Sequence, residues 1–233
     1  MRGLNILKKI LILAIILILP GFLYYQLTVK GKNSYHALSV FGPKKLAGTF
    51  HKVRGKDIPD TIYHTLPDFN LTDQDGKPVS LKAFNGKIFI ADFFYTRCPN
   101  ICNVMNSNMD SLASEYAHNK LVQFVSITVD PQRDSAPILK TYSQKYKAST
   151  AKWLFLTGDT STIYPLARNG FLVNALKVDN DDFIYSDKII LIDQEKRIRG
   201  YYSGTTSDDF DRLDNEIKVL LSEVLLKQTK PVY

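Results

Sequence analysis

Cysteine is scarce in this sequence of 233 residues, which contains only Cys98 and Cys102. Two cysteines four positions apart cannot form the set of disulfides that stabilises many small secreted proteins. A single close pair in an otherwise cysteine-free chain indicates redox chemistry or the binding of a soft metal ion. The alternative is that both are small buried residues without a chemical role.

A dense run of basic residues is also lacking. The chain has 30 lysines and arginines against 23 aspartates and glutamates, a formal net charge of +7, but the basic residues are scattered. We therefore expect no nucleic-acid partner, because such proteins concentrate positive charge on one face or segment. Hydrophobic residues (45%) and aromatic residues (12%) are frequent enough to exclude an intrinsically disordered chain.

Long apolar stretches are limited to one near the N-terminus. Residues Ile10 to Leu27 contain a single polar side chain, that of Gln26. As a helix this stretch would be about 27 Å long, close to the hydrocarbon thickness of a bilayer. Lys8 and Lys9 precede it, and positive charge of this kind marks the cytoplasmic side. Residues 1–27 therefore predict one N-terminal transmembrane helix, with the remainder of the chain exported.

Two other targeting signals would also explain an apolar N-terminus. A cleaved signal peptide needs a small-x-small site directly after the apolar run, and the sequence has none there. The charged segment before the run is too short for a mitochondrial transit peptide. We therefore expect a single-pass protein of the bacterial inner membrane, with its soluble domain on the periplasmic side.

The exported part divides into two segments. Residues 28–65 are polar and irregular, which predicts a tether and an N-terminal extension, and residues 66–228 predict one compact domain. Continuous apolar runs in this domain predict buried strands, and amphipathic runs predict helices. The expected strands are 88–95, 121–129, 153–156, 188–193 and 197–203, after a hairpin over 69–81 with an Asp-Gly turn. The expected helices are 99–119, 134–146, 160–168 and 207–227.

The order of these elements predicts the fold class. Strands alternate with helices, and the last two strands form a hairpin. This pattern is typical of an α/β fold in which helices flank a mixed β-sheet. A strand, then a cysteine pair, then a helix is the order found in thioredoxin-like domains, so we expect that architecture.

The local sequence should activate Cys98. If a helix begins near Pro99, its free N–H groups and positive dipole end favour a thiolate at Cys98. The charge of Arg97 acts in the same direction, and both would lower the pKa of the thiol from its free value of about 8.5. Cys102 lies about one turn later on the same side of the helix. Cys98 is therefore the expected reactive thiol.

The spacing of the pair leaves two chemistries open. Three residues separate the cysteines, one more than in the thioredoxin motif. A disulfide is still allowed, because Cα atoms one helical turn apart are about 6 Å from each other. Two thiolates at this spacing can equally hold Cu(I), a soft ion that accepts few ligands. Cys98 and Cys102 are thus predicted either as catalytic residues of a dithiol oxidoreductase or as metal ligands.

Two blocks of sequence resemble the SCO/SenC family of copper-handling proteins. They are Phe93–Cys102, which reads FFYTRCPNIC, and Val125–Asp134, which reads VSITVDPQRD. With further similarity at Leu154–Gly158 and Ile190–Asp193, the resemblance covers residues 66–226. It implies a thioredoxin-like domain tethered to the membrane by one helix. It also implies delivery of copper to the binuclear centre of cytochrome c oxidase, or reduction of that site's cysteines, with oxidase subunit II and a thiol reductant as expected partners.

One position departs from the family pattern. Family members bind copper with both cysteines and a histidine, and counting back from Asp193 places the histidine position at Tyr185. A tyrosine oxygen is hard and stays protonated at neutral pH, so it is a poor ligand for Cu(I). We expect Cu(I) to be held by the two thiolates and Cu(II) to be held poorly, because Cu(II) prefers nitrogen donors. The four histidines lie elsewhere and are expected at the surface: His36, His51, His64 and His118.

Met105 and Met109 continue the cysteine positions at helical spacing. Such a stripe is either a soft sulfur face for copper or part of a hydrophobic core, and we expect the core. Asp130, Arg133 and Asp134 are expected to order a loop and to cap the helix that follows it.

Three further functional classes compete with the copper interpretation. The main alternative is a periplasmic thiol-disulfide oxidoreductase without physiological copper binding. General reductases of this kind usually place a cis-proline opposite the cysteines, and the segment Ile184–Asp187 contains no proline. A peroxidase would use one cysteine with an arginine donor such as Arg133, and the close pair does not fit that pattern. A purely structural anchor protein predicts no effect from loss of both cysteines.

A topology experiment tests the predicted anchor. A reporter enzyme that is active only after export, fused after residue 40, should be active because Lys8 and Lys9 keep the N-terminus in the cytoplasm. The same reporter fused directly after Lys9 is the control and should be inactive. Activity of a cytoplasm-specific reporter at the later position would contradict the expected orientation.

Overall fold

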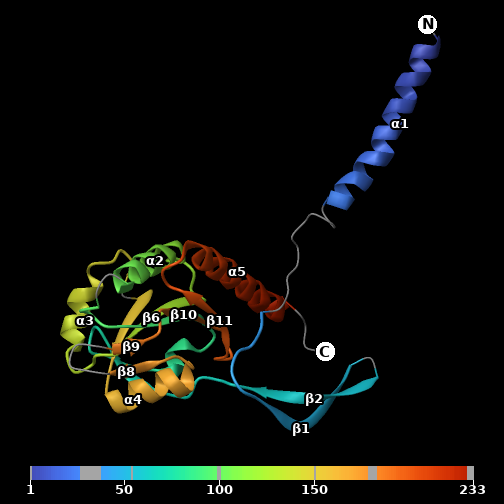
Figure 1. The fold of residues 1–233 in the computed structure, drawn as a ribbon. Helices are drawn as coiled ribbons and strands as arrows, with labels where there is room; N and C mark the ends of the chain where they lie inside the picture. Colours follow the sequence, from blue (N-terminus) through green and yellow to red (C-terminus); the bar gives the residue numbers. More distant parts are fainter. Residues whose placement is uncertain are drawn as a thin grey trace. The chain divides into compact units, whose positions relative to one another are not determined.

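The computed structural model describes residues 2–26, 38–53, 55–98, 101–149, 151–177 and 183–229. The chain forms two compact units, residues 1–37 and residues 38–233, and each is described by itself. Figure 1 shows the ribbon of both.

The first unit contains the helix α1 (Arg2–Tyr25), which accommodates Pro20 inside it. Its large described side chains between Ile12 and Tyr25 are exposed. Over the described ranges, no helix combines the length and the apolar character that a membrane span requires. The expected anchor therefore stays a prediction, and its last residue, Leu27, lies outside the described residues.

The second unit is built around a seven-stranded sheet with the strand order β11-β10-β5-β6-β7-β3-β4. The strands are β3 (Asn70–Asp73), β4 (Pro78–Ser80), β5 (Ile88–Phe94), β6 (Val122–Thr128), β7 (Trp153–Thr157), β10 (Lys188–Ile192) and β11 (Ile198–Ser203). The three central strands β5, β6 and β7 are parallel, and the outer pairs are antiparallel. The expected mixed sheet is confirmed.

Helices cover both faces of this sheet (Figure 1). They are η2 (Leu81–Phe84), α2 (Ile101–Glu115), α3 (Ala136–Ser143), α4 (Thr160–Pro165), η3 (Leu166–Gly170) and α5 (Ser207–Thr229). On one face, Phe94 stacks on Tyr142 of α3, with ring centroids 5.4 Å apart. On the other face, Phe93 packs edge-on against Phe171, which follows η3, at 5.3 Å. Adjacent residues of β5 thus enter opposite layers, as the alternation of a strand requires.

The strands β5 and β6 could be predicted from the sequence because both faces of the sheet are covered there. Every residue of β5 and of β6 is buried. A parallel strand that is covered on both faces needs apolar residues at nearly every position, which gives the continuous runs seen in the sequence.

Two of the expected helices have wrong boundaries. The helix α2 ends at Glu115 instead of near Asn119, because the backbone N–H groups of Ala117 and Asn119 turn back to Ser114 and Tyr116. The helix α3 ends at Ser143, and its N-cap is Ser135, not Asp134. The expected helix start at Pro99 lies outside the described residues.

Two short ribbons were missed. The strands β1 (Lys44–Val53) and β2 (Lys56–Tyr63) form an antiparallel hairpin within the segment expected to be irregular. The feature of the sequence that could have predicted this hairpin is the glycine at its turn, Gly55, which has a positive φ of 80°. The strands β8 (Ala175–Lys177) and β9 (Phe183–Tyr185) form a second antiparallel pair.

A buried carboxyl group lies in the middle of β5. The hydroxyl of Ser126 donates to Oδ1 of Asp92 (2.5 Å) and accepts from Nε1 of Trp153 (2.8 Å). The other carboxylate oxygen, Oδ2, is buried without a hydrogen-bond partner among the described residues. Burial raises the pKa of Asp92 to about 7, because the charged form would lose its hydration.

Asp92 should make stability fall as the pH rises from about 4 to about 7. The unfolded carboxyl loses its proton near pH 3.9, approximately the free value, whereas the folded one keeps it to about pH 7. Between these values the unfolded state binds fewer protons, so raising the pH favours unfolding. Asp92→Asn resembles the neutral acid and should flatten this dependence in urea unfolding at about pH 5 and about pH 7.5. The exposed variant Asp208→Asn is the control, and an unchanged slope in Asp92→Asn would contradict the assignment.

Candidate dithiol and copper site

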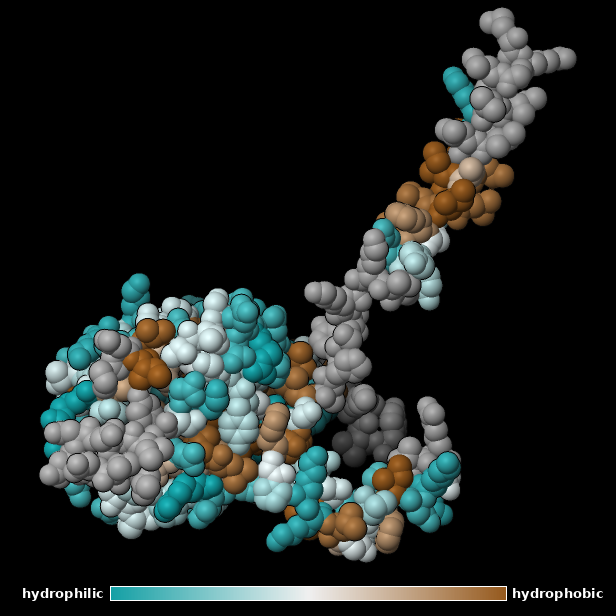
Figure 2. Space-filling view, viewed as in Figure 1, coloured by the Kyte–Doolittle hydropathy of each residue, from teal (hydrophilic) through white to brown (hydrophobic). Residues whose placement is uncertain are grey.

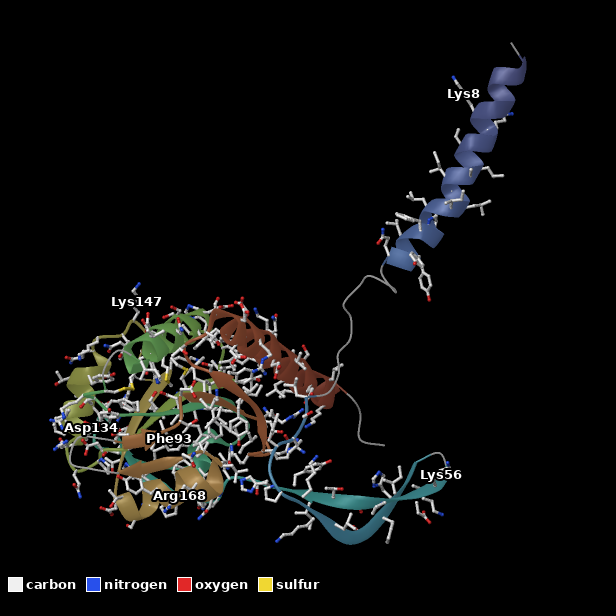
Figure 3. The ribbon with its side chains drawn as sticks, in the orientation of Figure 1. Lys8, Lys56, Phe93, Asp134, Lys147 and Arg168 are labelled. Carbon is white, nitrogen blue, oxygen red and sulfur yellow. A yellow bond between two sulfur atoms is a disulfide. The ribbon has the colours of Figure 1, made fainter. Side chains whose placement is uncertain are left out.

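The two cysteines lie at the carboxyl end of β5 and the beginning of α2. The backbone N–H of Cys98 donates to the carbonyl of Tyr95 (3.1 Å), which closes a turn directly after the strand. Cys102 is in the first turn of α2. The two residues form a disulfide with a Cα–Cα distance of 5.8 Å, close to the separation expected from the sequence. Figure 3 draws the surrounding side chains as sticks.

The two sulfur-bearing residues differ in exposure. Cys98 is 7% exposed and Cys102 is 1% exposed, and both belong to the main hydrophobic core. A reagent in solution therefore meets Cys98 first. The local reason is position, because Cys98 lies in the loop and Cys102 is already inside the helix.

The buried carboxylate of Asp134 holds the cysteine loop in place. Its Oδ2 accepts from the backbone N–H of Thr96 (3.0 Å), and its Oδ1 accepts from the hydroxyl of Thr96 (2.5 Å). Oδ2 also accepts from the hydroxyl of Thr128 at the end of β6 (2.5 Å). The expected loop-ordering role is confirmed, and the expected capping role is wrong. Asp134 is labelled in Figure 3.

Asp130 and Arg133 order the loop over residues 130–134, which carries Asp134. The guanidinium of Arg133 lies 3.6 Å from the buried carboxylate of Asp130. The carbonyl of Asp130 accepts from the N–H groups of Arg133 (3.0 Å) and Asp134 (2.9 Å). These bonds fix the turn that presents Asp134 to the cysteine loop.

Thr96 and Thr128 are positioning residues that the sequence did not reveal. Each is a common residue at the end of a strand, and its importance comes from sharing one carboxylate with the other. That sharing depends on the parallel pairing of β5 with β6, which places Phe94 opposite Thr128.

The two methionines belong to the core. Met105 and Met109 are fully buried. A Cβ atom at Gly204 would lie only 2.4 Å from Cγ of Met105, so this side chain fills the space beside the end of β11. This contact confirms the expected packing role of Met105.

The residue at the family's histidine position is a strand residue. Tyr185 ends β9 and pairs with Ala175 of β8. The expected exposed approach over 179–182 lies outside the described residues, which resume at 183. Three histidines are described, and two of them have other partners. Nε2 of His64 lies 2.7 Å from the carbonyl oxygen of Gly170, and Nδ1 of His51 lies 2.6 Å from Asp60. His118 is exposed after α2, and His36 is outside the described residues.

The two cysteine sulfurs are the donors that the structure brings together at this site. In the described ranges, no group of three or more His, Cys, Asp or Glu side chains is arranged to hold a metal ion. A disulfide has no thiolate to offer, so copper binding here requires prior reduction. Once reduced, two thiolates one helical turn apart suit Cu(I).

The difference in exposure predicts the order of alkylation. In reduced, folded protein, one equivalent of iodoacetamide should modify Cys98 before Cys102, because Cys98 is more exposed. Mass spectrometry of the tryptic peptides measures this preference, and mild oxidation before alkylation should protect both thiols reversibly. The control is the same reaction in denaturant, where the preference should disappear. Faster labelling of Cys102, or thiols that resist oxidation, would contradict the prediction.

Comparison with known proteins identifies the family. The SCO1/SenC family profile matches residues 60–221. A SCO1/SenC family lipoprotein from Bacillus anthracis is 34% identical, and its crystal structure matches with a TM-score of 0.64 over 68% of this chain and 95% of that one. BsSco, a member of the Sco family of cytochrome c oxidase assembly proteins with a disulfide switch, is 30% identical, with a TM-score of 0.60 over 66% and 92%. ScoI from Bradyrhizobium japonicum, solved with copper bound, is 26% identical, with a TM-score of 0.55 over 67% and 99%. By sequence and by its thioredoxin-like fold, this chain belongs to the SCO1/SenC family.

Proposed function

We propose that this protein handles Cu(I), thiols or both through Cys98 and Cys102 during assembly of the copper site of cytochrome c oxidase. The observation that supports the proposal most directly is the disulfide between a loop cysteine and a cysteine in the first turn of α2. Two of its relatives are described in matching terms: BsSco as an oxidase assembly protein with a disulfide switch, and ScoI as a copper-bound protein.

The proposed cycle needs an external thiol reductant. A dithiol partner supplies two electrons and two protons, which break the S–S bond and give two thiols, while the partner becomes a disulfide. Cu(I) then binds the two sulfurs as thiolates, and the two thiol protons are released. Transfer of the ion to a client with more ligands regenerates the free pair.

A thiol-disulfide oxidoreductase without physiological copper binding is the second candidate function. The observation that favours it is Tyr185, which stands where the family's copper-binding histidine is expected. Without that imidazole the pair keeps its thiol chemistry and loses the donor that Cu(II) prefers. The client would be the same, with its cysteines reduced instead of metallated.

The proposed location follows from the sequence. Residues 1–27 would anchor the chain in the bacterial inner membrane, and the domain would lie on the periplasmic side. This location places the cysteine pair on the periplasmic side of the membrane, where oxidase subunit II and a thiol reductant are its proposed partners. No nucleic acid is involved.

Metal titration separates the two functions. Reduced wild-type protein should bind one Cu(I) against a competing chelator, and Cys98→Ser/Cys102→Ser should bind none, because the thiolates are the donors. Wild-type protein should hold Cu(II) weakly. Tyr185→His should strengthen Cu(II) binding at least tenfold and give a thiolate-to-copper absorption band, and Tyr185→Phe is its control.

The possible contrary results have distinct meanings. A stable coloured Cu(II) complex of the wild-type protein would show that another residue supplies the third ligand. Failure of every form to bind Cu(I), with a disulfide that still cycles, would leave the oxidoreductase function. Unchanged oxidase activity in cells carrying the double cysteine variant would contradict both.

A further inference from the structure

The hairpin of β1 and β2 is an unpartnered ribbon. Its strands pair with each other and with no strand of the seven-stranded sheet (Figure 1). None of its described side chains is buried. Among its large apolar residues, Leu46 is 73% exposed and Phe50 is 66% exposed. A two-stranded ribbon alone is marginally stable in water, and exposed apolar side chains of this size commonly mark a binding surface.

The base of the ribbon is fastened to the domain. Before β1, the N–H of Phe41 donates to the carbonyl of Ile198 (2.9 Å), and its ring packs on Tyr201 with centroids 5.5 Å apart. After β2, Nε2 of His64 lies 2.7 Å from the carbonyl oxygen of Gly170, and the N–H of Leu66 donates to the backbone carbonyl of Lys196 (2.9 Å). The ribbon is therefore attached to the domain before β1 and after β2, while the side chains of its strands stay exposed or half-buried.

Both faces of the ribbon carry lysines and apolar residues, but the apolar side chains differ in exposure. Leu46 and Phe50 on one face are 73% and 66% exposed, whereas Ile58 and Ile62 on the other face are 40% and 57% exposed. Residues directly opposite each other on antiparallel strands share a face. The pairs Leu46–Thr61, Phe50–Pro59, Lys44–Tyr63 and Lys52–Asp57 therefore make up one face, which we call the apolar-basic face. The carboxylate of Asp60 lies on the other face, where it accepts from Thr49 (2.5 Å) and contacts His51 (2.6 Å). Figure 2 shows brown apolar residues among teal ones along the ribbon.

We propose that the apolar-basic face of this ribbon docks on an anionic lipid surface, with Leu46 and Phe50 inserted among the headgroups. Residues 44–63 contain five basic side chains against two carboxylates. Basic residues are attracted to the negative headgroups, and apolar side chains between them gain by leaving water. A second copy of the ribbon would bring like charges together, which disfavours self-pairing.

The length of the preceding chain makes this contact feasible. Residues 28–43 connect the predicted membrane segment to β1, and when fully extended they span at most about 55 Å. The inference rests on the proposed membrane attachment only for this proximity. Docking would hold the domain at the membrane surface.

Tryptophan scanning in the full-length chain tests the proposal. Phe50→Trp and the control Ile58→Trp place a reporter on the apolar-basic face and the opposite face, respectively. The native Trp153 is buried and supplies a constant background. In nanodiscs of phosphatidylcholine with about one-third phosphatidylglycerol, brominated lipid should quench Phe50→Trp at least twice as strongly as Ile58→Trp. In neutral phosphatidylcholine discs the difference should vanish.

Charge reversal provides the second variant. Adding Lys44→Glu and Lys52→Glu to Phe50→Trp should weaken binding to free phosphatidylglycerol vesicles more than tenfold, because each lysine near an anionic surface contributes about fivefold. Equal quenching of the two tryptophans, or quenching that does not depend on lipid charge, would overturn the proposal. So would a blue shift of Phe50→Trp that grows with protein concentration in the absence of lipid, which indicates a second copy.

Failure of the membrane anchor is recognised separately. A chain that does not co-elute with the nanodiscs contradicts the proposed attachment. The same chain added to free phosphatidylglycerol vesicles still tests the ribbon, where quenching of Phe50→Trp supports the docking and its absence overturns it.

Discussion

One carboxylate, that of Asp134, fixes the geometry on which the cysteine site depends. It accepts hydrogen bonds from Thr96 in the cysteine loop and from Thr128 at the end of β6. The loop therefore follows the position of two central parallel strands instead of moving independently. Because Asp134 is almost completely buried, its bonds form in a low-dielectric setting, where charge-assisted hydrogen bonds are strong. The positions of the two cysteines therefore depend on the hydrogen bonds of Asp134.

The elements that the sequence predicted well are those whose residue pattern is imposed by burial. The strands β5 and β6 are buried on both faces and thus read as continuous apolar runs. The hairpin of β1 and β2 was missed because it buries neither face, so no hydrophobic periodicity was required of it. The boundary at Asp134 failed for a related reason. An acidic residue just before a helix is a good local cap, but here its carboxylate is used by residues far away in the sequence.

The candidate site also combines features that the sequence could predict with features that it could not. The disulfide between Cys98 and Cys102 could be predicted as possible from their spacing alone, whereas the use of the pair for thiol or copper chemistry stays a prediction. The unequal exposure of the two cysteines could not be predicted, because it depends on where α2 begins relative to the core. The expected histidine position is the most informative departure. Tyr185 occurs in the short ribbon of β8 and β9, in a chain that otherwise matches the SCO1/SenC family. Family membership therefore establishes the fold, while copper binding by this chain, and any third ligand for it, stays a proposal.

The asymmetry of the pair gives the proposed thiol exchange a direction. An incoming thiolate meets the sulfur of Cys98, because Cys102 is the more deeply buried partner. Attack there forms a mixed disulfide and releases the sulfur of Cys102 as the leaving group. The helix α2 is described from Ile101 onward, so the free N–H groups and the dipole that were expected to favour a thiolate at Cys98 also act on Cys102 in its first turn. The second thiol of the partner then attacks the partner's own sulfur in the mixed disulfide, which gives the partner a disulfide and releases Cys98 as a thiolate. Both cysteines of the proposed cycle are then reduced and able to hold Cu(I). In the proposed exchange, burial thus favours Cys98 as the sulfur that is attacked and Cys102 as the leaving group.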